Sequence, residues 1–211
     1  IMEESNLTIS VTSFSPSILM APKLIPIPEI FCAVNADDED IRNNITANIN
    51  KDVPQVIPYE TQWGKVVALV VGGPSLDSTL DELKEKYNDG MPVVTVNGSY
   101  KYCMDRGIRP AAFIMLDSRE FNNRFVDPPH EKCKYFICSQ CHPSVLDKLE
   151  GYETHIWHCA GQDQYQDILE NKYGEIHKDF FPVLGGSTVT LRAIHLMRML
   201  GFPKFEIFGF D

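Results

Sequence analysis

Two short glycine-rich segments have the residue types of an anion-binding turn. The first glycine turn follows an apolar run, and the second glycine turn precedes a stretch of helical character. Their members are Gly72, Gly73, Pro74 and Ser75 in the first turn, and Gly185, Gly186, Ser187 and Thr188 in the second. Glycine lets backbone N–H groups approach an anion closely, and a helix start adds the positive end of its dipole. Two such turns in one chain indicate a site for a phosphorylated ligand, in the first place a nucleotide.

Each turn also fits a purely structural interpretation. Turns from strand to helix need glycine for their geometry alone. The first turn lacks the Gly-Lys-Ser/Thr of a Walker A loop and is not a full dinucleotide fingerprint. In the second turn, Ser187 or Thr188 can serve as the N-cap of the next helix. The occurrence of two turns favours ligand contact over this alternative.

Polar residues follow the other predicted strands. Asn97 can hydrogen-bond a base or a ribose, or it can stabilise a turn with Gly98. Ser99 lies two residues further on and is a second candidate for ligand contact. Asp117 can hold Mg²⁺ on a diphosphate or cap the helix that follows, and Asp211 has the same two interpretations. The remaining polar residues at strand ends are Arg119, Ser139, Gln140, His142 and His158.

The cysteines raise the alternative of a zinc site. Cys138, Cys141 and Cys159, with His158, have the residue types of a Cys₃His centre. A single Cys-x-x-Cys is common by chance, however, and the six cysteines lack the density of a disulfide scaffold. We therefore expect the cysteines to be small core residues in a reducing compartment. His195, on the apolar face of a predicted helix, is expected to be structural.

An alternation of strands and helices must position these residues. The strands are expected at 66–71, 92–96, 111–116, 134–138, 154–158 and 205–208, and the helices at 76–87, 99–106, 143–149 and 188–200. This order predicts an α/β fold with a Rossmann-like, doubly wound and mostly parallel sheet. Right-handed crossovers place the carboxyl ends of the strands at one edge, and ligands of such sheets bind there.

Residues 1–62 differ in character from the rest, because prolines and polar residues interrupt every long element. Only 37–50 has a helical pattern, with Ile41, Ile45 and Ile49 on one side and acidic residues in the first turn. We expect an irregular N-terminal arm that packs on the main domain or on a neighbouring subunit, which would make a homo-oligomer. Residues 63–211 form the predicted nucleotide-binding domain. Since the chain ends directly after an apolar strand, we expect it to be truncated at its C-terminus.

Composition and net charge limit the classes of partner that the chain can bind. The 211 residues carry a net charge of −10, which argues against binding to nucleic acid or to an anionic membrane. The longest apolar runs are about a third of a membrane span, and the N-terminus has no signal-peptide pattern. We therefore expect a cytoplasmic protein whose partners are a nucleotide and a small-molecule acceptor.

Six segments, in this order along the chain, resemble one family. They are 70–77 (Val-Val-Gly-Gly-Pro-Ser-Leu-Asp), 93–99, 107–117, 138–144, 185–196 and 200–211. The match covers 66–211 and resembles the domain shared by archaeal 6-hydroxymethylpterin diphosphokinases (MptE-like) and bacterial flagellar motility accessory factors. The segment 138–144 (Cys-Ser-Gln-Cys-His-Pro-Ser) looks most like uncharacterised phage or prophage members.

The resemblance implies a transferase that uses a nucleotide. ATP and Mg²⁺ would bind across the strand ends, and a diphosphate would pass to a hydroxymethyl group. The two glycine turns would hold the phosphates from opposite sides, and Asp117 would hold the metal. Asp117 and Asp211 are the catalytic candidates. Catalysis would consist mostly of positioning and charge neutralisation.

A second, more distant resemblance is to bacterial CMP-sialic-acid-dependent sialyltransferases. They share a Gly-x-Gly-Pro-Ser turn, an asparagine after the second strand (here Asn97) and a Ser/Thr-Gly turn before a late helix. This chain has Gly-Gly-Pro-Ser and stops before the segment where such enzymes carry their catalytic histidine. This second resemblance implies a glycosyltransferase that prefers CMP and does not require Mg²⁺.

A third alternative is a non-catalytic nucleotide-binding module of a phage-encoded system, since no residue stands out as a catalytic base.

Overall fold

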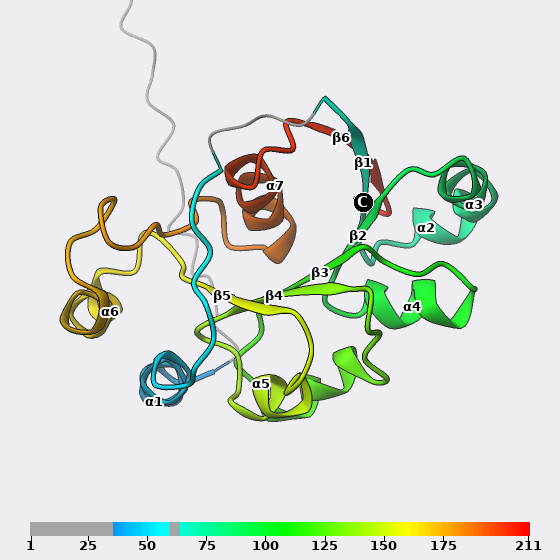
Figure 1. Ribbon diagram of the computed structural model, residues 1–211. Coiled ribbons are helices and arrows are strands. Elements are labelled where there is room, and N and C mark those ends of the chain that lie inside the picture. The colour runs from blue at the N-terminus through cyan, green and yellow to red at the C-terminus, as the bar shows by residue number, and fades with distance from the viewer. Residues whose placement is uncertain (1–35, 60–63) are drawn as a thin grey trace, which may run out of the picture. The chain divides into compact units, whose positions relative to one another are not determined.

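Near-continuous apolar runs form the strands of one central sheet, because both of its faces are covered by helices. The structure is a computed structural model and describes residues 36–59 and 64–211. Its six strands are all parallel, in the order β5-β4-β3-β2-β1-β6 (Figure 1). They are β1 (Val66–Val70), β2 (Val93–Val96), β3 (Ala112–Met115), β4 (Lys134–Cys138), β5 (Thr154–Trp157) and β6 (Lys204–Phe208). The predicted Rossmann-like, doubly wound fold is confirmed.

The helices divide between the two faces of the sheet. They are α1 (Asp38–Ile49), α2 (Ser75–Ser78), α3 (Leu80–Asn88), α4 (Ser99–Asp105), α5 (Ser144–Lys148), α6 (Gln166–Tyr173) and α7 (Val189–Met199), with 3₁₀ segments η2 (Glu120–Val126) and η3 (Asp163–Tyr165). Helices α2 to α5 cover one face and α7 the other (Figure 1). The reason is that the chain steps from β1 to β5 in one direction and returns to β6 in the opposite direction, while each crossover keeps its hand.

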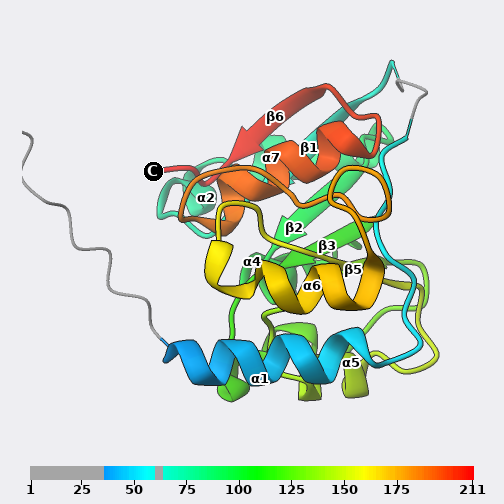
Figure 2. The same cartoon turned by 90° about the vertical axis from the view of Figure 1, so that its left-hand side faces the viewer.

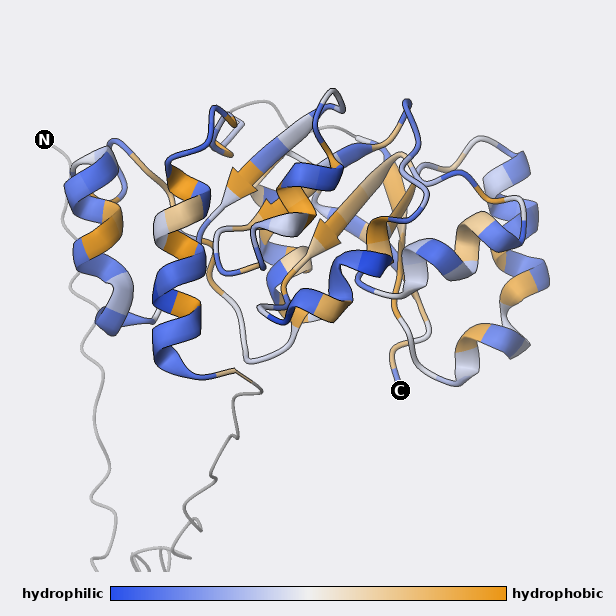
Figure 3. Ribbon diagram, turned by 90° about the horizontal axis from the view of Figure 1, so that it is seen from below, coloured by the Kyte–Doolittle hydropathy of each residue, from blue (hydrophilic) through white to orange (hydrophobic). Residues whose placement is uncertain are grey.

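Two local features depart from the sequence expectation. The helix predicted over 76–87 is divided into α2 and α3 at Thr79, whose backbone (φ −106°, ψ 7°) leaves the helical region. The elements η3 and α6 form in segments for which the sequence analysis placed no element, whereas η2 follows Asp117, where a helix was part of one of the two interpretations. Figure 3 shows that apolar strands lie at the centre of the fold and that the hydrophilic parts of the helices face outward.

Helix α1 confirms the helical pattern of the N-terminal region. Ile41, Ile45 and Ile49 are buried in a cluster with side chains of β5 and α6, and α1 lies beside α6 (Figure 2). The side-chain amides of Asn44 and Asn48 donate hydrogen bonds to backbone carbonyls after β3 and β4. This helix therefore packs on the α/β domain. Most of the predicted arm, and its expected role in an oligomer, lie outside the described residues.

The described cysteines are core residues, as predicted. Cys138 and Cys141 are fully buried within the main hydrophobic cluster. None of the helices in the described ranges combines the length and apolar character needed to cross a bilayer.

Candidate functional site

The first glycine turn lies where the ends of β1 and β6 meet. The Gly73 N–H donates a hydrogen bond of 2.8 Å to the Gly209 carbonyl. A Cβ atom on Gly73 would lie 2.5 Å from that carbonyl oxygen, so no larger residue fits without moving backbone. Gly209 itself has φ +73°, and a Cβ atom on it would lie 2.7 Å from the Val71 carbonyl oxygen. The close approach of two chain segments therefore requires Gly73, whereas the exposed Gly72 has open space around it.

An intramolecular carboxylate occupies the start of α2. The Asp211 carboxylate accepts hydrogen bonds from the Ser75 backbone N–H, at 3.0 Å, and from the Ser75 hydroxyl. The first turn therefore binds an anion in this structure, and that anion is Asp211. A phosphate could take this position only by displacing the carboxylate. Phosphate contact by the first turn and catalysis by Asp211 both stay predictions.

Asn97 and Ser99 link the ends of neighbouring strands. Asn97 adopts φ +45°, and its amide exchanges hydrogen bonds with the backbone of Leu116 after β3. The buried Ser99 hydroxyl donates to the Val70 carbonyl at 2.7 Å and accepts from the Val96 N–H at 3.0 Å. Both side chains thus extend the hydrogen bonding of the sheet beyond its strands. Their contact with a ligand stays a prediction.

Asp117 is paired with the arginine two residues further along the chain. Arg119 donates from its backbone N–H and its Nε to Oδ1, at 3.1 and 3.0 Å, and from Nη2 to Oδ2 at 2.8 Å. Burial raises the pKa of Asp117, but the hydrogen bonds from Arg119 outweigh it and hold that pKa below its ordinary value. The carboxylate is therefore charged and already neutralised by a guanidinium at neutral pH.

This pairing does not fit a preformed magnesium site. A divalent cation on Asp117 would have to share both carboxylate oxygens with a bound guanidinium, which repels it. Within the two described ranges, no group of three or more His, Cys, Asp or Glu side chains could hold a metal ion. The zinc interpretation therefore lacks support, although the sulfur atoms of Cys138 and Cys159 lie 3.6 Å apart. Magnesium stays a prediction for a nucleotide-bound protein in which Arg119 has moved.

His158 is packed among aromatic rings. It is 1% exposed and contacts the rings of Tyr173 and Phe180. Neither ring nitrogen has a hydrogen-bond partner in the described part of the chain, and burial lowers its pKa to about 4. His158 is therefore neutral at physiological pH and does not serve as a ready proton donor.

The second glycine turn is exposed and covers the start of α7. Gly185 has φ +140° and packs so closely on Arg192 that a Cβ would lie 2.9 Å from the arginine Cγ. The Thr188 hydroxyl accepts a hydrogen bond from the Leu191 N–H at 3.4 Å and caps the helix. Thr188 therefore fulfils the capping interpretation. Gly186 and Ser187 lie between these two residues and are also exposed.

Topology brings both turns to the same edge of the sheet. The first turn follows the carboxyl end of β1. Val183 bridges to Cys159 just after β5, so the second turn also starts at a carboxyl end. Figure 2 shows the start of α7 at the edge toward which the strands point, and Figure 1 shows α2 and α7 on opposite faces. Asn97 and Asp117, which follow β2 and β3, lie along the edge between the two turns.

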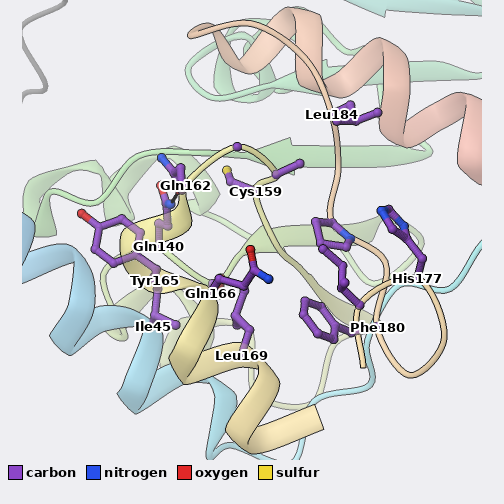
Figure 4. Close-up of a pocket in the computed structure, with 15 residues that line it drawn as sticks. Ile45, Gln140, Cys159, Gln162, Tyr165, Gln166, Leu169, His177, Phe180 and Leu184 are labelled. Atoms are coloured by element: carbon purple, nitrogen blue, oxygen red, sulfur yellow. Dashed lines mark hydrogen bonds between the residues drawn. The ribbon is translucent and has the colours of Figure 1, made fainter. Parts of the chain in front are cut away.

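A cavity of about 60 Å³ lies at the ends of β4 and β5 (Figure 4). Its lining includes Gln140, Cys159, Gln162, Tyr165, Phe180 and Leu184. Gln140 donates a hydrogen bond to Gln162 across it. This volume accepts a few water-sized groups, far less than a nucleotide. Sequence reasoning placed Gln140 at the edge but missed Gln162 and Tyr165, because their segment carries no strand or helix pattern.

Sequence reasoning also missed Arg192. It is 8% exposed, and its Nη1 donates to the carbonyls of Ala160, at 3.3 Å, and Val183, at 2.7 Å. The sequence does show a charged residue between the apolar Leu191 and Ala193 in a predicted helix. A helical pattern alone does not tell a buried arginine from an exposed one.

Comparisons with known proteins agree with this architecture. A family model described as 6-hydroxymethylpterin diphosphokinase MptE-like matches residues 39–211. The fold is similar to that of the MAf glycosyltransferase from Magnetospirillum magneticum AMB-1, with a TM-score of 0.62 and 17% identity. The similarity covers 82% of this chain and 27% of that one, so this chain corresponds to about a quarter of the larger protein. No curated protein sequence matches. The family match extends over most of the chain and includes all of α1 but its first residue, both glycine turns and Asp117. The chain therefore belongs to the MptE-like family.

Proposed function

We propose that the protein is a nucleotide-binding transferase whose site extends along the carboxyl edge of the sheet. The observation that carries the proposal is the convergence of the two glycine turns, with Asn97 and Asp117 between them, in a chain that belongs to the MptE-like family. Helix α7, which is 11 residues long, supports the proposal further, because its N-terminal end lies at this edge and carries the positive end of the helix dipole.

In the first candidate reaction, a diphosphate passes from ATP to a hydroxymethyl group of the acceptor. The exposed second turn and the start of α7 bind phosphate oxygens through backbone N–H groups. Arg119, oriented by Asp117, contributes N–H donors at the end of β3. Magnesium, when bound with the nucleotide, would neutralise further phosphate charge. The protein contributes alignment and charge neutralisation, as is typical of phosphoryl transfer.

The second candidate reaction is glycosyl transfer from a sugar nucleotide such as a CMP-sugar. The Asp117–Arg119 pair favours it, because the carboxylate that the first candidate needs as a metal ligand is already bound by a guanidinium. A protein that binds nucleotides without catalysing either reaction is the remaining alternative. A cytoplasmic location and a phage origin stay predictions.

Thermal shifts of the full chain against ATP, GTP, CTP, CMP and UDP-sugars, each with and without Mg²⁺, test the proposal. A Mg²⁺-dependent rise with ATP or GTP supports diphosphate transfer, and a CMP-selective rise without metal supports glycosyl transfer. If no nucleotide raises the melting temperature, the proposal is wrong. A rise without turnover of any acceptor supports the binding module.

A matched pair of variants locates the site. A Cβ atom on Gly186 would lie 2.6 Å from the end of the exposed Leu191 side chain, so Gly186→Asp and Gly186→Asn make nearly the same steric demand. The two variants differ in charge. We expect the aspartate variant to abolish the nucleotide-induced shift, because its carboxylate repels phosphate, and the asparagine variant to retain it. Equal shifts in both variants would place the phosphates elsewhere.

A further inference from the structure

Arg192 is a buried cation without an acidic partner. Arginine is almost never buried to this extent unless it is paired, because removing its charge from water is costly. None of the ion pairs formed by residues 36–59 and 64–211 includes it. The first turn of α7, on which Arg192 lies, contains no acidic residue.

Only part of the guanidinium is used by the protein. Its five N–H donors include two on Nη1, and the carbonyls of Ala160 and Val183 take up both. The single donor on Nε and the two on Nη2 have no acceptor in the described portion of the chain, and neither nitrogen is among the fully buried atoms that lack a partner, so both reach solvent. Ala160 lines the cavity at the ends of β4 and β5, and so do the neighbours of Val183. Arg192 itself is not among the residues that line this cavity; its guanidinium is anchored to two backbone carbonyls, with three donors left over.

The surroundings of Arg192 favour a negative charge. Gly185 of the second turn packs directly on its side chain, and the N-terminal end of α7 adds the helix dipole. Burial lowers the pKa of His195, and the charges of Arg198 and Arg192 lower it further. The hydrogen bond with Cys138 and the charge of Arg192 hold the pKa of Cys159 below its ordinary value, although burial raises it. In both cases the charge of Arg192 is the smallest of the contributions to the pKa.

We infer that Arg192 is the anchor of an anion subsite, in which its free N–H donors and the second glycine turn bind a phosphate or diphosphate group of the ligand. A guanidinium suits this role because its planar fork matches the oxygens of a phosphate. The inference deepens the proposed function and rests on it only for the identity of the ligand that carries the phosphate. The subsite lies on the α7 face of the sheet, away from the position that Asp211 occupies.

Calorimetric titration of the full chain with inorganic pyrophosphate, at constant ionic strength, tests this inference. The wild type should bind pyrophosphate. Arg192→Met should raise the dissociation constant about tenfold or more, because charge-assisted hydrogen bonds are lost. Arg192→Lys, which keeps the charge but not the fork, should lie between them. Arg198→Met on the exposed side of the same helix is the matched control and should bind within about twofold of the wild type.

The inference is overturned if pyrophosphate does not bind the wild type, or if Arg192→Met binds it as tightly. Because Arg192→Met also removes two hydrogen bonds to backbone, its unliganded melting temperature is measured first. If it does not fold, the comparison between Arg192→Lys and the wild type decides, and equal affinity refutes the role. Parallel titrations with CMP and ATP separate the two proposals. If the wild type and Arg192→Met bind the nucleotide equally well, the subsite is refuted and the proposed function stands. If pyrophosphate binding depends on Arg192 but no nucleotide binds, the proposed function is refuted and the subsite stands.

Discussion

Replacing Gly73 by alanine introduces a methyl group where β1 and β6 converge. Its Cβ would lie 2.4 Å from the Asp211 carboxylate and 2.5 Å from the Gly209 carbonyl oxygen. The carboxylate can swing away, but the carbonyl belongs to backbone held by β6. The two segments must therefore separate, and the 2.8 Å hydrogen bond between Gly73 and Gly209 is strained or lost.

The expected cost adds an overpacking contribution to a lost hydrogen bond. Overpacking costs about 1–3 kcal/mol and a backbone hydrogen bond about 1 kcal/mol, so we expect unfolding free energy to fall by about 2–4 kcal/mol. For a domain of this size that lowers the melting temperature by on the order of 10 °C. Gly72→Ala in the same turn is the matched control, because its Cβ meets no atom within 4 Å and its φ is not positive. We expect that variant to be neutral or more stable by up to about 1 kcal/mol.

Urea denaturation of both variants, followed by circular dichroism, measures the difference. If Gly73→Ala is as stable as Gly72→Ala, the close approach of Gly73 and Gly209 is not a constraint on the fold. If instead both variants keep wild-type stability and both lose nucleotide binding, the two glycines serve the phosphate as the sequence predicted. Any larger substitution at Gly73 perturbs stability together with binding, and so does not report on binding alone.

Three further perturbations follow from the structure. In the wild type, the charged Asp117 stabilises the fold in full above the ordinary carboxyl pKa, and this contribution is lost as pH falls through the lowered pKa of Asp117. Asp117→Asn should therefore be less stable than the wild type at pH 7, with a smaller difference at pH 3, as denaturation at the two pH values checks. His158→Phe should remove a destabilisation of about 3 kcal/mol that develops as pH falls from 6.5 to about 4, since the buried neutral ring resists protonation. Unchanged pH dependence in the Phe variant would contradict that burial. Asn48→Ala should cost about 1–3 kcal/mol, because it leaves two backbone carbonyls after β4 without their donor, whereas the exposed Asn43→Ala should be neutral. Equal melting temperatures would show that α1 is not held by this contact.

The Asp211 carboxylate bears on how the site operates. It occupies the start of α2, a position that the sequence analysis assigned to phosphate. With this position filled by the protein's own carboxylate, we propose that the second turn and Arg192 bind the anion of the ligand. The ligand geometry that we propose is therefore asymmetric, with phosphate held from the α7 face.

Local pattern was sufficient for the sheet and for most helices. Apolar runs such as 66–71 predict strands covered on both faces, and the spacing of Ile41, Ile45 and Ile49 predicts α1. The order of these elements then places the glycine turns and Asp117 at one edge, because crossover handedness follows from chain chirality. These properties depend on residues close together in the sequence, so the sequence by itself determined them.

Only the tertiary structure decided what the polar residues at that edge contact. The partner of Ser75 is Asp211, 136 residues away, and the sequence contains no pattern that pairs them. Arg192 and the exposed Arg198 lie on one helix, and only packing against the ends of β5 and the second turn makes one of them buried. The physical reason is that hydrogen bonding and burial depend on which distant segments the fold brings together, whereas strands and helices depend chiefly on neighbouring residues.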